Sequence, residues 1–363
     1  MTDLTIIVPV LNEVQNIAPF CLSIQRALSN CSWRWEILFV DDDSKDGTAE
    51  AIEQFANENP FISVRLIRRI HRYGLSSACI EGILASLSSL IVVMDVDGQH
   101  DETLLPQMMA EFQNPELDLV IASRYIEGGS TGSLAAKRVR VSEMATQLAQ
   151  FLSKTDVTDP MSGFFMVKRV CFKAAAKQLF GQGFKILLDI LLTTPGKLTI
   201  KELPYHMRSR QYGESKLNAK VVLDYFLLLA HHLCGWFFPL DFMLFILVGF
   251  IGSLFHLFVL GIALKSHTLT FLEAQSLATL VTVGINFYFN NTLTFSYQRL
   301  RGRRIYKGLL KFLGLCSLGF LLNLSVSYTT FSFLHSWVVA GLLGYIISGL
   351  WNYMCSKTSI WTP

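Results

Sequence analysis

The sequence lacks the cysteine patterns of zinc sites, dithiol redox centres and disulfide frameworks. Its seven cysteines are scattered, odd in number and never arranged as C-x-x-C. Such spacing indicates reduced thiols and a catalytic part in the cytosol. The start of the chain also lacks a basic segment followed by a long apolar core, so we expect no signal peptide.

Two nucleotide-binding fingerprints are absent as well. No G-x-G-x-x-G follows the first apolar run, and no G-x-x-x-x-G-K-[ST] occurs in the chain. A dinucleotide-dependent dehydrogenase and a P-loop NTPase are therefore disfavoured. The formal net charge of +3 is too small to indicate a nucleic-acid partner, and we expect none.

Charged residues are scarce and unevenly distributed. They make up 16% of the chain, whose mean hydropathy is +0.40. Most acids precede residue 235, whereas Phe, Leu, Ile, Val and Gly dominate from about residue 237 onward. A chain of 363 residues with this asymmetry is typical of two domains, one of them in a membrane. We predict a catalytic domain over residues 1–217, interfacial amphipathic helices over 218–240 and a membrane domain over 241–363.

Leu90–Asp101, LIVVMDVDGQHD, is the stretch with the clearest chemistry. Its apolar start predicts a buried strand of a parallel sheet, and ligands bind at the carboxyl ends of such strands. Asp95, Asp97 and Gln99 alternate along the exit from that strand, so all three can face one ion. A hard divalent cation such as Mg²⁺ or Mn²⁺ takes one or two carboxylates together with phosphate oxygens. A solvated turn is the alternative for an isolated D-x-D.

Apolar runs alternate with helix-like segments on both sides of this stretch. They predict strands over Leu4–Val10, Trp35–Val40, Ile62–Ile67, Leu90–Met94 and Leu119–Ser123. This alternation favours an α/β fold with a mostly parallel, doubly wound sheet of the Rossmann-like kind.

Acidic and basic turns follow two of these strands. Asp41–Thr48, DDDSKDGT, can accept hydrogen bonds from a ribose or a base, although an aspartate that caps the next helix is an equal alternative. Arg68–Ala78, RRIHRYGLSSA, places basic groups before a small-residue helix, where a diphosphate can bind. The histidines near the motifs, His71, His100 and His206, are expected to be polar loop residues.

Seven motifs occur in order along the first part of the chain: VPVLNE, VDDDSKDGT, RYGLSSA, MDVDGQHD, ASRYIEGG, DPMSGFFMVKR and RQYGESKL. Together they resemble the family-2 glycosyltransferases of the GT-A fold, over about Thr5–Leu217. The likeness is greatest to the polyprenyl-phosphate branch, which contains dolichol-phosphate mannose synthases and bacterial polyprenyl-phosphate glucosyltransferases. It implies a GT-A-type domain that binds a nucleotide sugar.

The resemblance also implies roles for individual residues. The nucleotide sugar is expected to contact Pro9, Leu11, Glu13, Asp41, Asp95 and Asp97. The metal ion, Mg²⁺ or Mn²⁺, is expected at Asp95, Asp97 and Gln99. The expected catalytic residues are Asp95, Asp97, Arg124 and Arg210, and the expected contacts of the acceptor phosphate are Arg124, Arg138 and Arg210. Asp159 is implied to lie close to the reaction centre, where the residues alone indicate a turn with a helix cap.

The arginines are also notable for their surroundings. Arg124 follows a strand end in a glycine-containing loop, and Arg210 lies in the basic segment His206–Leu217 just before the membrane part. A guanidinium fork matches phosphate oxygens at two points, which suits a lipid phosphate at the bilayer surface. The alternative, chiefly for Arg208 and Lys216, is attraction of juxtamembrane cations to anionic lipid.

Four apolar stretches are long enough to cross a bilayer as an all-α membrane domain. They cover about Phe242–Leu264, Leu272–Phe295, Gly308–Thr330 and Trp337–Met354. The link Tyr297–Lys311 carries six cations, so the positive-inside rule predicts that it lies in the cytoplasm with the catalytic domain. Asn286–Phe295 and the spacing of the four spans resemble the GtrA-like membrane family. We expect a multi-pass protein of a bacterial or archaeal cell membrane, in contact with membrane lipid.

Polar residues occur before and inside these stretches. Val221–Leu240 includes Asp224 and two histidines, so it is interpreted as a helix in the membrane interface, anchored by Trp236. The asparagines inside the spans are costly in lipid and are expected to face other helices: Asn286, Asn290, Asn291 and Asn323.

These features predict a metal-dependent, inverting transfer of a hexose from a nucleotide sugar to a polyprenyl or dolichyl phosphate. Mannose from GDP-mannose is favoured, because RYGLSSA and the four-span part look closer to the mannose synthases; a UDP-glucose-dependent glucosyltransferase is the alternative. A processive polysaccharide synthase is disfavoured because Q-x-x-R-W is absent. The alternative of another class is a membrane protein that binds or translocates a lipid-linked sugar and has a silent catalytic domain. The sequence is compatible with a homo-oligomer.

Overall fold

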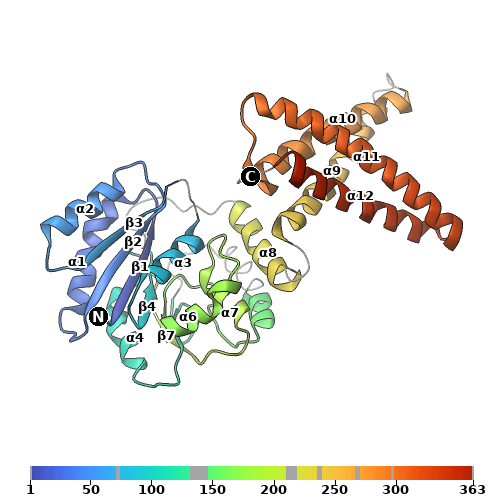
Figure 1. Cartoon of the computed structure of the whole chain (residues 1–363). Coiled ribbons are helices and arrows are strands. Elements are labelled where there is room, and N and C mark those ends of the chain that lie inside the picture. Colours follow the sequence, from blue (N-terminus) through green and yellow to red (C-terminus); the bar gives the residue numbers. More distant parts are fainter. Residues whose placement is uncertain are drawn as a thin grey trace. The chain divides into compact units, whose positions relative to one another are not determined.

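The computed structural model describes residues 2–70, 74–130, 146–209, 219–234, 239–265, 270–295 and 298–361. The chain forms two compact units, Met1–Leu233 and Cys234–Pro363. The first is an α/β unit and the second is helical (Figure 1). The division falls inside the segment 218–240, which was predicted to form interfacial helices.

One seven-stranded sheet forms the centre of the first unit. Its strands are β1 (Leu4–Val10), β2 (Trp35–Asp41), β3 (Val64–Arg68), β4 (Leu90–Val93), β5 (Leu119–Ser123), β6 (Phe165–Lys168) and β7 (Ile200–Pro204). Their order across the sheet is β3-β2-β1-β4-β6-β5-β7. All neighbours pair in parallel except β6, which is antiparallel to β4 and β5. The predicted mostly parallel α/β sheet is confirmed.

The strand directions bring several loops to one edge of the sheet. β1, β2, β4, β5 and β7 run the same way, so the loops that follow them leave from a common edge. Because β6 runs in the opposite sense, the loop that precedes it arrives at this same edge. The edge therefore collects residues 11–16, 42–47, 94–101, 124–130, 159–164 and 205–209.

Helices cover both faces of the sheet, because alternate strand residues point to opposite sides and are apolar on each. One face packs against α1 (Ile17–Leu28), α2 (Thr48–Glu58) and α4 (Leu105–Glu111), around residues such as Ile6 and Phe39. The other packs against α3 (Leu75–Ala85), α6 (Arg169–Ala175) and α7 (Ile186–Thr193), around residues such as Ile7 and Leu38. Figure 1 shows this doubly wound arrangement.

A further helix, α8 (Ala219–Cys234), packs on the first unit beside α7. Its Leu228 and Leu229 are buried in a cluster with Leu188 of α7. Phe226 and Leu233, seven residues apart and hence on one side of a helix, are 57% and 60% exposed. α8 therefore buries one apolar face in the α/β unit and leaves another apolar surface uncovered among the described residues.

The second unit consists of α9 (Leu240–Lys265), α10 (Phe271–Phe289), α11 (Arg303–Leu334) and α12 (Trp337–Ser359). A π-helical turn, Asn290–Thr294, follows α10. Each predicted span coincides with one of these helices. Within the described part of the chain, α9 and α11 are the two helices long and apolar enough to cross a membrane. Four crossings stay a prediction.

Glycine–asparagine contacts lie where helices of the second unit cross. A Cβ added at Gly252 of α9 would overlap the side-chain amide of Asn286 in α10. A Cβ at Gly319 of α11 would likewise overlap Asn352 of α12. The absence of a side chain thus lets the helices approach closely, and Asn286 faces a neighbouring helix as expected.

Candidate active site

The acidic residues that follow β4 lie at the shared edge of the sheet. The side chain of Asp95 is 39% exposed, whereas Asp97 is 5% exposed. Asp97 Oδ1 accepts a 3.0 Å hydrogen bond from the backbone N–H of Gln99. Gly98 turns the chain between them with a φ of +77°, which favours glycine. The predicted metal ligands are therefore brought together in one short turn.

His100 supports this turn from inside the protein. It is 6% exposed, and its Nδ1 accepts a 3.0 Å hydrogen bond from the backbone N–H of Asp95. Its ring stacks on Phe164 with a centroid distance of 5.2 Å. Burial lowers the pKa of His100 to about 4, so the imidazole is neutral and can accept at Nδ1. His100 is a loop residue as expected, and the structure adds that its ring is packed against the core.

The loops after β1 and β2 are tied together beside this turn. The backbone N–H of Asn12 donates to Ser44 Oγ at 2.8 Å, and that of Glu13 donates to Thr48 Oγ1 at 2.9 Å. Asn12 adopts a φ of +56°, the left-handed conformation that asparagine tolerates in turns. Three residues predicted to contact the nucleotide sugar lie along this pair of loops or at the end of β1: Pro9, Leu11 and Glu13.

Asp41 ends β2 next to these loops, and its side chain is fully buried. Its Oδ2 accepts a 3.2 Å hydrogen bond from the backbone N–H of Ser44. Its Oδ1 is buried and has no hydrogen-bond partner among the described residues. A buried carboxylate oxygen without a donor costs free energy unless a ligand supplies one. This arrangement fits a residue that accepts a hydrogen bond from a base or a ribose.

Asp42, by contrast, is engaged within the protein. Its carboxylate pairs with the buried guanidinium of Arg69 and accepts a 2.7 Å hydrogen bond from the backbone N–H of Gly74. Arg69 also lies 3.2 Å from Glu81. One cation of the basic turn expected at the diphosphate therefore fastens that turn to the end of β2. His71, Arg72 and Tyr73 of the turn lie outside the described residues.

Arg124, directly after β5, forms a two-point ion pair with Asp159. Its Nε and Nη2 donate to the two carboxylate oxygens at 2.7 and 2.8 Å. The Asp159 side chain is 1% exposed and that of Arg124 is 16% exposed. Burial alone would lower the pKa of Arg124, but its hydrogen bonds to Asp159 and the charge of that carboxylate raise it. The resemblance implied that Asp159 lies close to the reaction centre. In the structure Asp159 binds Arg124, which lines the cavity.

The loop that carries Asp159 is fixed by Glu202 of β7. The Glu202 carboxylate accepts from the backbone N–H of Asp159 at 3.2 Å, and from the N–H and hydroxyl of Thr158 at 2.9 and 2.8 Å. Farther along the loop, a Cβ added at Gly163 would lie 3.4 Å from Asp95 Oδ2. The loop 159–164, which leads into the antiparallel β6, therefore runs from Arg124 to Asp95.

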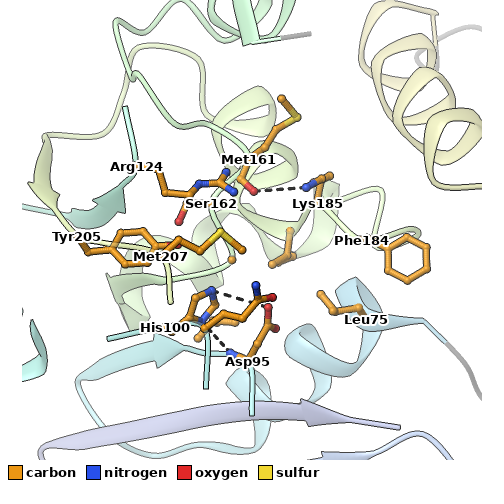
Figure 2. A pocket seen from close by; sticks show the side chains of 14 residues that line it. Leu75, Asp95, His100, Arg124, Met161, Ser162, Phe184, Lys185, Tyr205 and Met207 are labelled. Atoms are coloured by element: carbon orange, nitrogen blue, oxygen red, sulfur yellow. Dashed lines mark hydrogen bonds and ion pairs between the residues drawn. The ribbon is translucent and has the colours of Figure 1, made fainter. Parts of the chain in front are cut away.

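These loops enclose a cavity of about 210 Å³ (Figure 2). Figure 2 shows Asp95 and His100 on one side of it, and Arg124 and Lys185 on the opposite side. Apolar residues complete the lining: Leu75, Val93, Met161, Phe184, Ile186 and Met207. The cavity therefore combines an acidic side, a cationic side and an apolar wall.

The segment after β7 is fastened to the turn after β4. Arg208 forms ion pairs with Asp101 at 2.6 Å and Glu102 at 2.8 Å. Its backbone N–H donates to the Gln99 carbonyl oxygen at 3.1 Å, and the Gln99 amide donates to the Arg208 carbonyl oxygen at 3.4 Å. Arg208 is thus bound within the catalytic unit. Arg138 and Arg210 lie outside the described residues, and their phosphate contacts stay predictions.

Comparison with known proteins agrees with this geometry. Residues 5–175 match the family model described as glycosyl transferase family 2, and residues 244–361 match that of the GtrA/DPMS transmembrane domain. The curated dolichol-phosphate mannosyltransferase of Pyrococcus furiosus is 31% identical over 98% of this chain and 99% of its own length. This chain belongs to the family-2 glycosyltransferases. The resemblance inferred from the motifs is therefore confirmed.

Other relatives of this glycosyltransferase cover less of the chain. The dolichol-phosphate mannosyltransferase of Mycosarcoma maydis is 34% identical over 61% of this chain and 76% of its own. Glucosyl-3-phosphoglycerate synthase of Mycobacterium tuberculosis, solved with Mn²⁺ and UDP-glucose, has a TM-score of 0.50 and 19% identity over 64% of this chain and 80% of its own. This structural likeness confirms the GT-A-like fold of the first unit.

The residues at the β4 turn of this glycosyltransferase fit a hard divalent cation. Two carboxylates and an amide side chain present oxygen ligands, which Mg²⁺ and Mn²⁺ prefer. In the described part of the chain, no group of three or more His, Cys, Asp or Glu could hold a metal ion. The donor set therefore fits an ion that binds together with substrate phosphates, and not a closed centre made by protein side chains alone.

Sequence reasoning missed Lys185, Phe184 and Tyr205, all of which line the cavity. Lys185 precedes ILLDILL, so the segment reads as the start of an apolar helix with no chemical motif. Tyr205 follows a strand that was not predicted. These residues reach the site through tertiary packing, and no local pattern marks them.

Proposed function

We propose that this glycosyltransferase transfers mannose from a nucleotide sugar to the phosphate of a dolichyl or other polyprenyl lipid. The proposal is carried by the full-length similarity to the dolichol-phosphate mannosyltransferase of P. furiosus. The relative from Mycosarcoma maydis bears the same name. The site supports it independently, because a reaction between two phosphate compounds needs both a place for a metal-bound diphosphate and cations opposite it.

The chemistry requires one displacement. A phosphate oxygen of the acceptor bonds to the anomeric carbon while the bond from that carbon to the donor diphosphate breaks. The electron pair of the broken bond leaves with the nucleoside diphosphate. Because the acceptor phosphate is already anionic at neutral pH, no strong general base is needed. In-line displacement inverts the anomeric centre, so an α-linked donor gives a β-linked lipid.

The parts of the site divide this work. Asp41 accepts a hydrogen bond from the nucleoside through its buried Oδ1. Asp95, Asp97 and Gln99 would hold Mg²⁺ or Mn²⁺, which neutralises the departing diphosphate when bound. Arg124, oriented by Asp159, faces the acceptor and offsets repulsion between the two phosphates.

Because the hydrocarbon tail of the acceptor lies in lipid, the reaction takes place at a membrane surface. The exposed Phe226 and Leu233 of α8 suit the interface, and α9 and α11 can cross the bilayer. We place the catalytic unit at the cytoplasmic face of a bacterial or archaeal membrane, with α10 and α12 as two further spans. The six cations of the link Tyr297–Lys311 support this orientation.

Membranes that contain the chain would be incubated with polyprenyl phosphate and a panel of radiolabelled nucleotide sugars. We expect labelled lipid from GDP-mannose and little from UDP-glucose, and none in matched membranes that carry Asp97→Asn. Labelled lipid from UDP-glucose alone would identify a polyprenyl-phosphate glucosyltransferase. No labelled lipid with any donor would contradict the proposal and favour a protein that binds or translocates a finished lipid-linked sugar.

A further inference from the structure

The cationic side of the cavity contains two groups in different electrostatic situations. Arg124 has two of its donors and much of its charge engaged by Asp159. The ammonium of Lys185 contacts the Met161 carbonyl oxygen at 3.5 Å. Among the described residues Lys185 forms no ion pair, and the charges of Asp159 and Asp95 act on it only from farther away. Lys185 is thus the lining cation whose charge the described part of the protein does not pair.

The backbone just before Lys185 is fixed by contacts with two helices. The Gly183 carbonyl oxygen accepts a 3.1 Å hydrogen bond from the backbone N–H of Ser76 at the start of α3. On the other side, a Cβ added at Gly183 would lie 3.1 Å from Asp224 Cβ of α8. The ring of Phe180 lies 4.9 Å from that of His231, also in α8. The segment 180–185 is therefore packed between α3 and α8.

A buried carboxylate of α7 reinforces this packing. Asp189 is 1% exposed and accepts hydrogen bonds from the backbone N–H groups of Phe180 and Gly181 at 3.0 and 2.8 Å. Its Oδ1 also lies 2.8 Å from Nε2 of His232 in α8. The backbone that leads to Lys185 is therefore fixed, and the Lys185 side chain lines the cavity. Desolvating a cation without a counter-ion is costly, and a site that retains such a group gains from an anionic ligand.

We propose that Lys185 binds the phosphate of the polyprenyl acceptor, an inference that rests on the proposed function. The donor diphosphate belongs with the metal ligands at Asp95, and in-line attack brings the acceptor phosphate from the other side of the sugar. Lys185 lies on that opposite side of the cavity (Figure 2). Its neighbour Phe184 adds an apolar surface for the start of the lipid tail. α8, which packs against this segment, links the acceptor site to the proposed membrane interface.

Binding of a short acceptor analogue tests the proposal without requiring transfer. Full-length protein in neutral detergent would be titrated with farnesyl phosphate and, separately, with farnesol. We expect the parent to prefer the phosphate, and Lys185→Met to lose that preference by on the order of tenfold to a hundredfold, the effect of one charged hydrogen bond. Lys185→Arg should retain most of it. Lys177→Met, which removes an exposed lysine of the same unit, should change nothing.

Two controls separate this result from misfolding and from a donor role. The unfolding midpoint and the affinity for GDP-mannose should be the same in Lys185→Met and the parent. If Lys185→Met does not fold, Lys185→Gln replaces it, because glutamine keeps a polar head without the charge. A loss confined to GDP-mannose binding, an unchanged preference for farnesyl phosphate, or a parent that does not distinguish the phosphate from the alcohol would each overturn the proposal.

Transfer assays on the same proteins test the proposed function separately from the role of Lys185. A parent that binds farnesyl phosphate through Lys185 and yet forms no mannosylated lipid would refute mannose transfer and leave the phosphate site standing. If the parent forms mannosylated lipid, and Lys185→Met is equally active at limiting acceptor, mannose transfer stands and the phosphate site at Lys185 is refuted.

Discussion

The two-point pair between Arg124 and Asp159 makes the shape of the guanidinium matter as much as its charge. Arg124→Lys keeps the charge but loses the planar fork. Removing one partner of a buried ion pair lowers the free energy of unfolding by about 3–5 kcal/mol. Because Arg124→Lys keeps the charge, we expect it to lower the free energy of unfolding by only about 1–3 kcal/mol. We predict a lower unfolding midpoint and transfer slower by roughly tenfold or more. Thermal unfolding and mannose transfer by full-length protein in detergent measure both.

Arg68→Lys is the matched control for this substitution. Arg68 pairs with Glu50 at 3.3 Å on the surface, where the two side chains are 45% and 63% exposed. Exposed pairs contribute about 0–1 kcal/mol, so neither stability nor transfer should change. If Arg124→Lys behaves like Arg68→Lys in both measurements, the fork has no role in the site.

The pH dependence of acceptor use should report on Lys185. Burial lowers the pKa of its ammonium, and the charge of Arg124 lowers it further, while Asp159 and Asp95 act in the opposite sense. As pH rises through this lowered pKa, the ammonium loses its charge before an ordinary lysine does. We predict that kcat/KM for polyprenyl phosphate falls on the alkaline side, below the usual lysine pKa of about 10.4. Lys185→Arg should abolish this decline, because a guanidinium stays charged; a decline that persists in Lys185→Arg would belong to another group.

The β4 turn should be needed for catalysis and dispensable for folding. Asp95 is 39% exposed at a strand end, and exposed substitutions usually change stability by within about 0.5 kcal/mol. We predict that Asp95→Asn abolishes mannose transfer with an unchanged unfolding midpoint, and that EDTA abolishes transfer by the parent until Mg²⁺ or Mn²⁺ is restored. Turnover that survives EDTA would refute the assignment of a metal to this turn.

At the scale of elements, Asn291 in the π-helical turn joins three parts of the second unit. Its Oδ1 accepts from the Leu300 N–H at 2.8 Å and from Trp361 Nε1 at 3.0 Å, and its Nδ2 donates to the Leu300 carbonyl oxygen at 3.2 Å. Trp361 is fully buried and stacks on Phe295 at 4.5 Å. Asn291→Leu would leave these partners unpaired, at about 1–3 kcal/mol for each buried group.

We therefore predict that Asn291→Leu shortens the lifetime of the full-length protein in detergent. The measurement is the fraction that remains monodisperse in size-exclusion chromatography after heating. Thr292→Val is the control on the same turn, because the Thr292 hydroxyl donates to the carbonyl oxygens of Tyr288 and Phe289, within its own helix. Equal lifetimes for the two variants would show that the Asn291 contacts do not hold the unit together.

The elements also show why some of the fold was predictable and some was not. β1, β2, β4 and β5 are short, mostly apolar runs, so their composition predicted them. β3 begins two residues later than predicted, and β7, IKELP, has too few apolar residues to be predicted. The antiparallel direction of β6 depends on the connection before it and not on its composition. Asp95 and Asp97 were predictable because the acidic pair directly follows an apolar strand in the same segment of sequence. Lys185 was not predictable, because it comes close to these residues only in the folded unit.

At the scale of the whole molecule, positive charge concentrates between α10 and α11. Arg299 and Arg301 precede α11, and Arg303, Arg304, Lys307 and Lys311 lie in its first turns. α9 and α11 can cross the membrane by length and composition. α10 is 19 residues long and includes Glu273 and Asn286, so whether it also crosses decides on which side these cations lie. The positive-inside rule predicts that it does, and that the cations face the cytoplasm.

Paired cysteines distinguish the arrangements. Lys265→Cys, at the end of α9, and Arg301→Cys would be made singly in a chain whose native cysteines are replaced, and intact cells would be treated with an impermeant maleimide. If α10 crosses, the two positions lie on opposite sides, so Lys265→Cys should be labelled and Arg301→Cys should be labelled only after lysis. Labelling of both would mean that α10 does not cross. Labelling of Arg301→Cys alone would reverse the topology, and it would separate the catalytic unit from a cytosolic supply of nucleotide sugar, because both ends of a four-span unit lie on the side of that link.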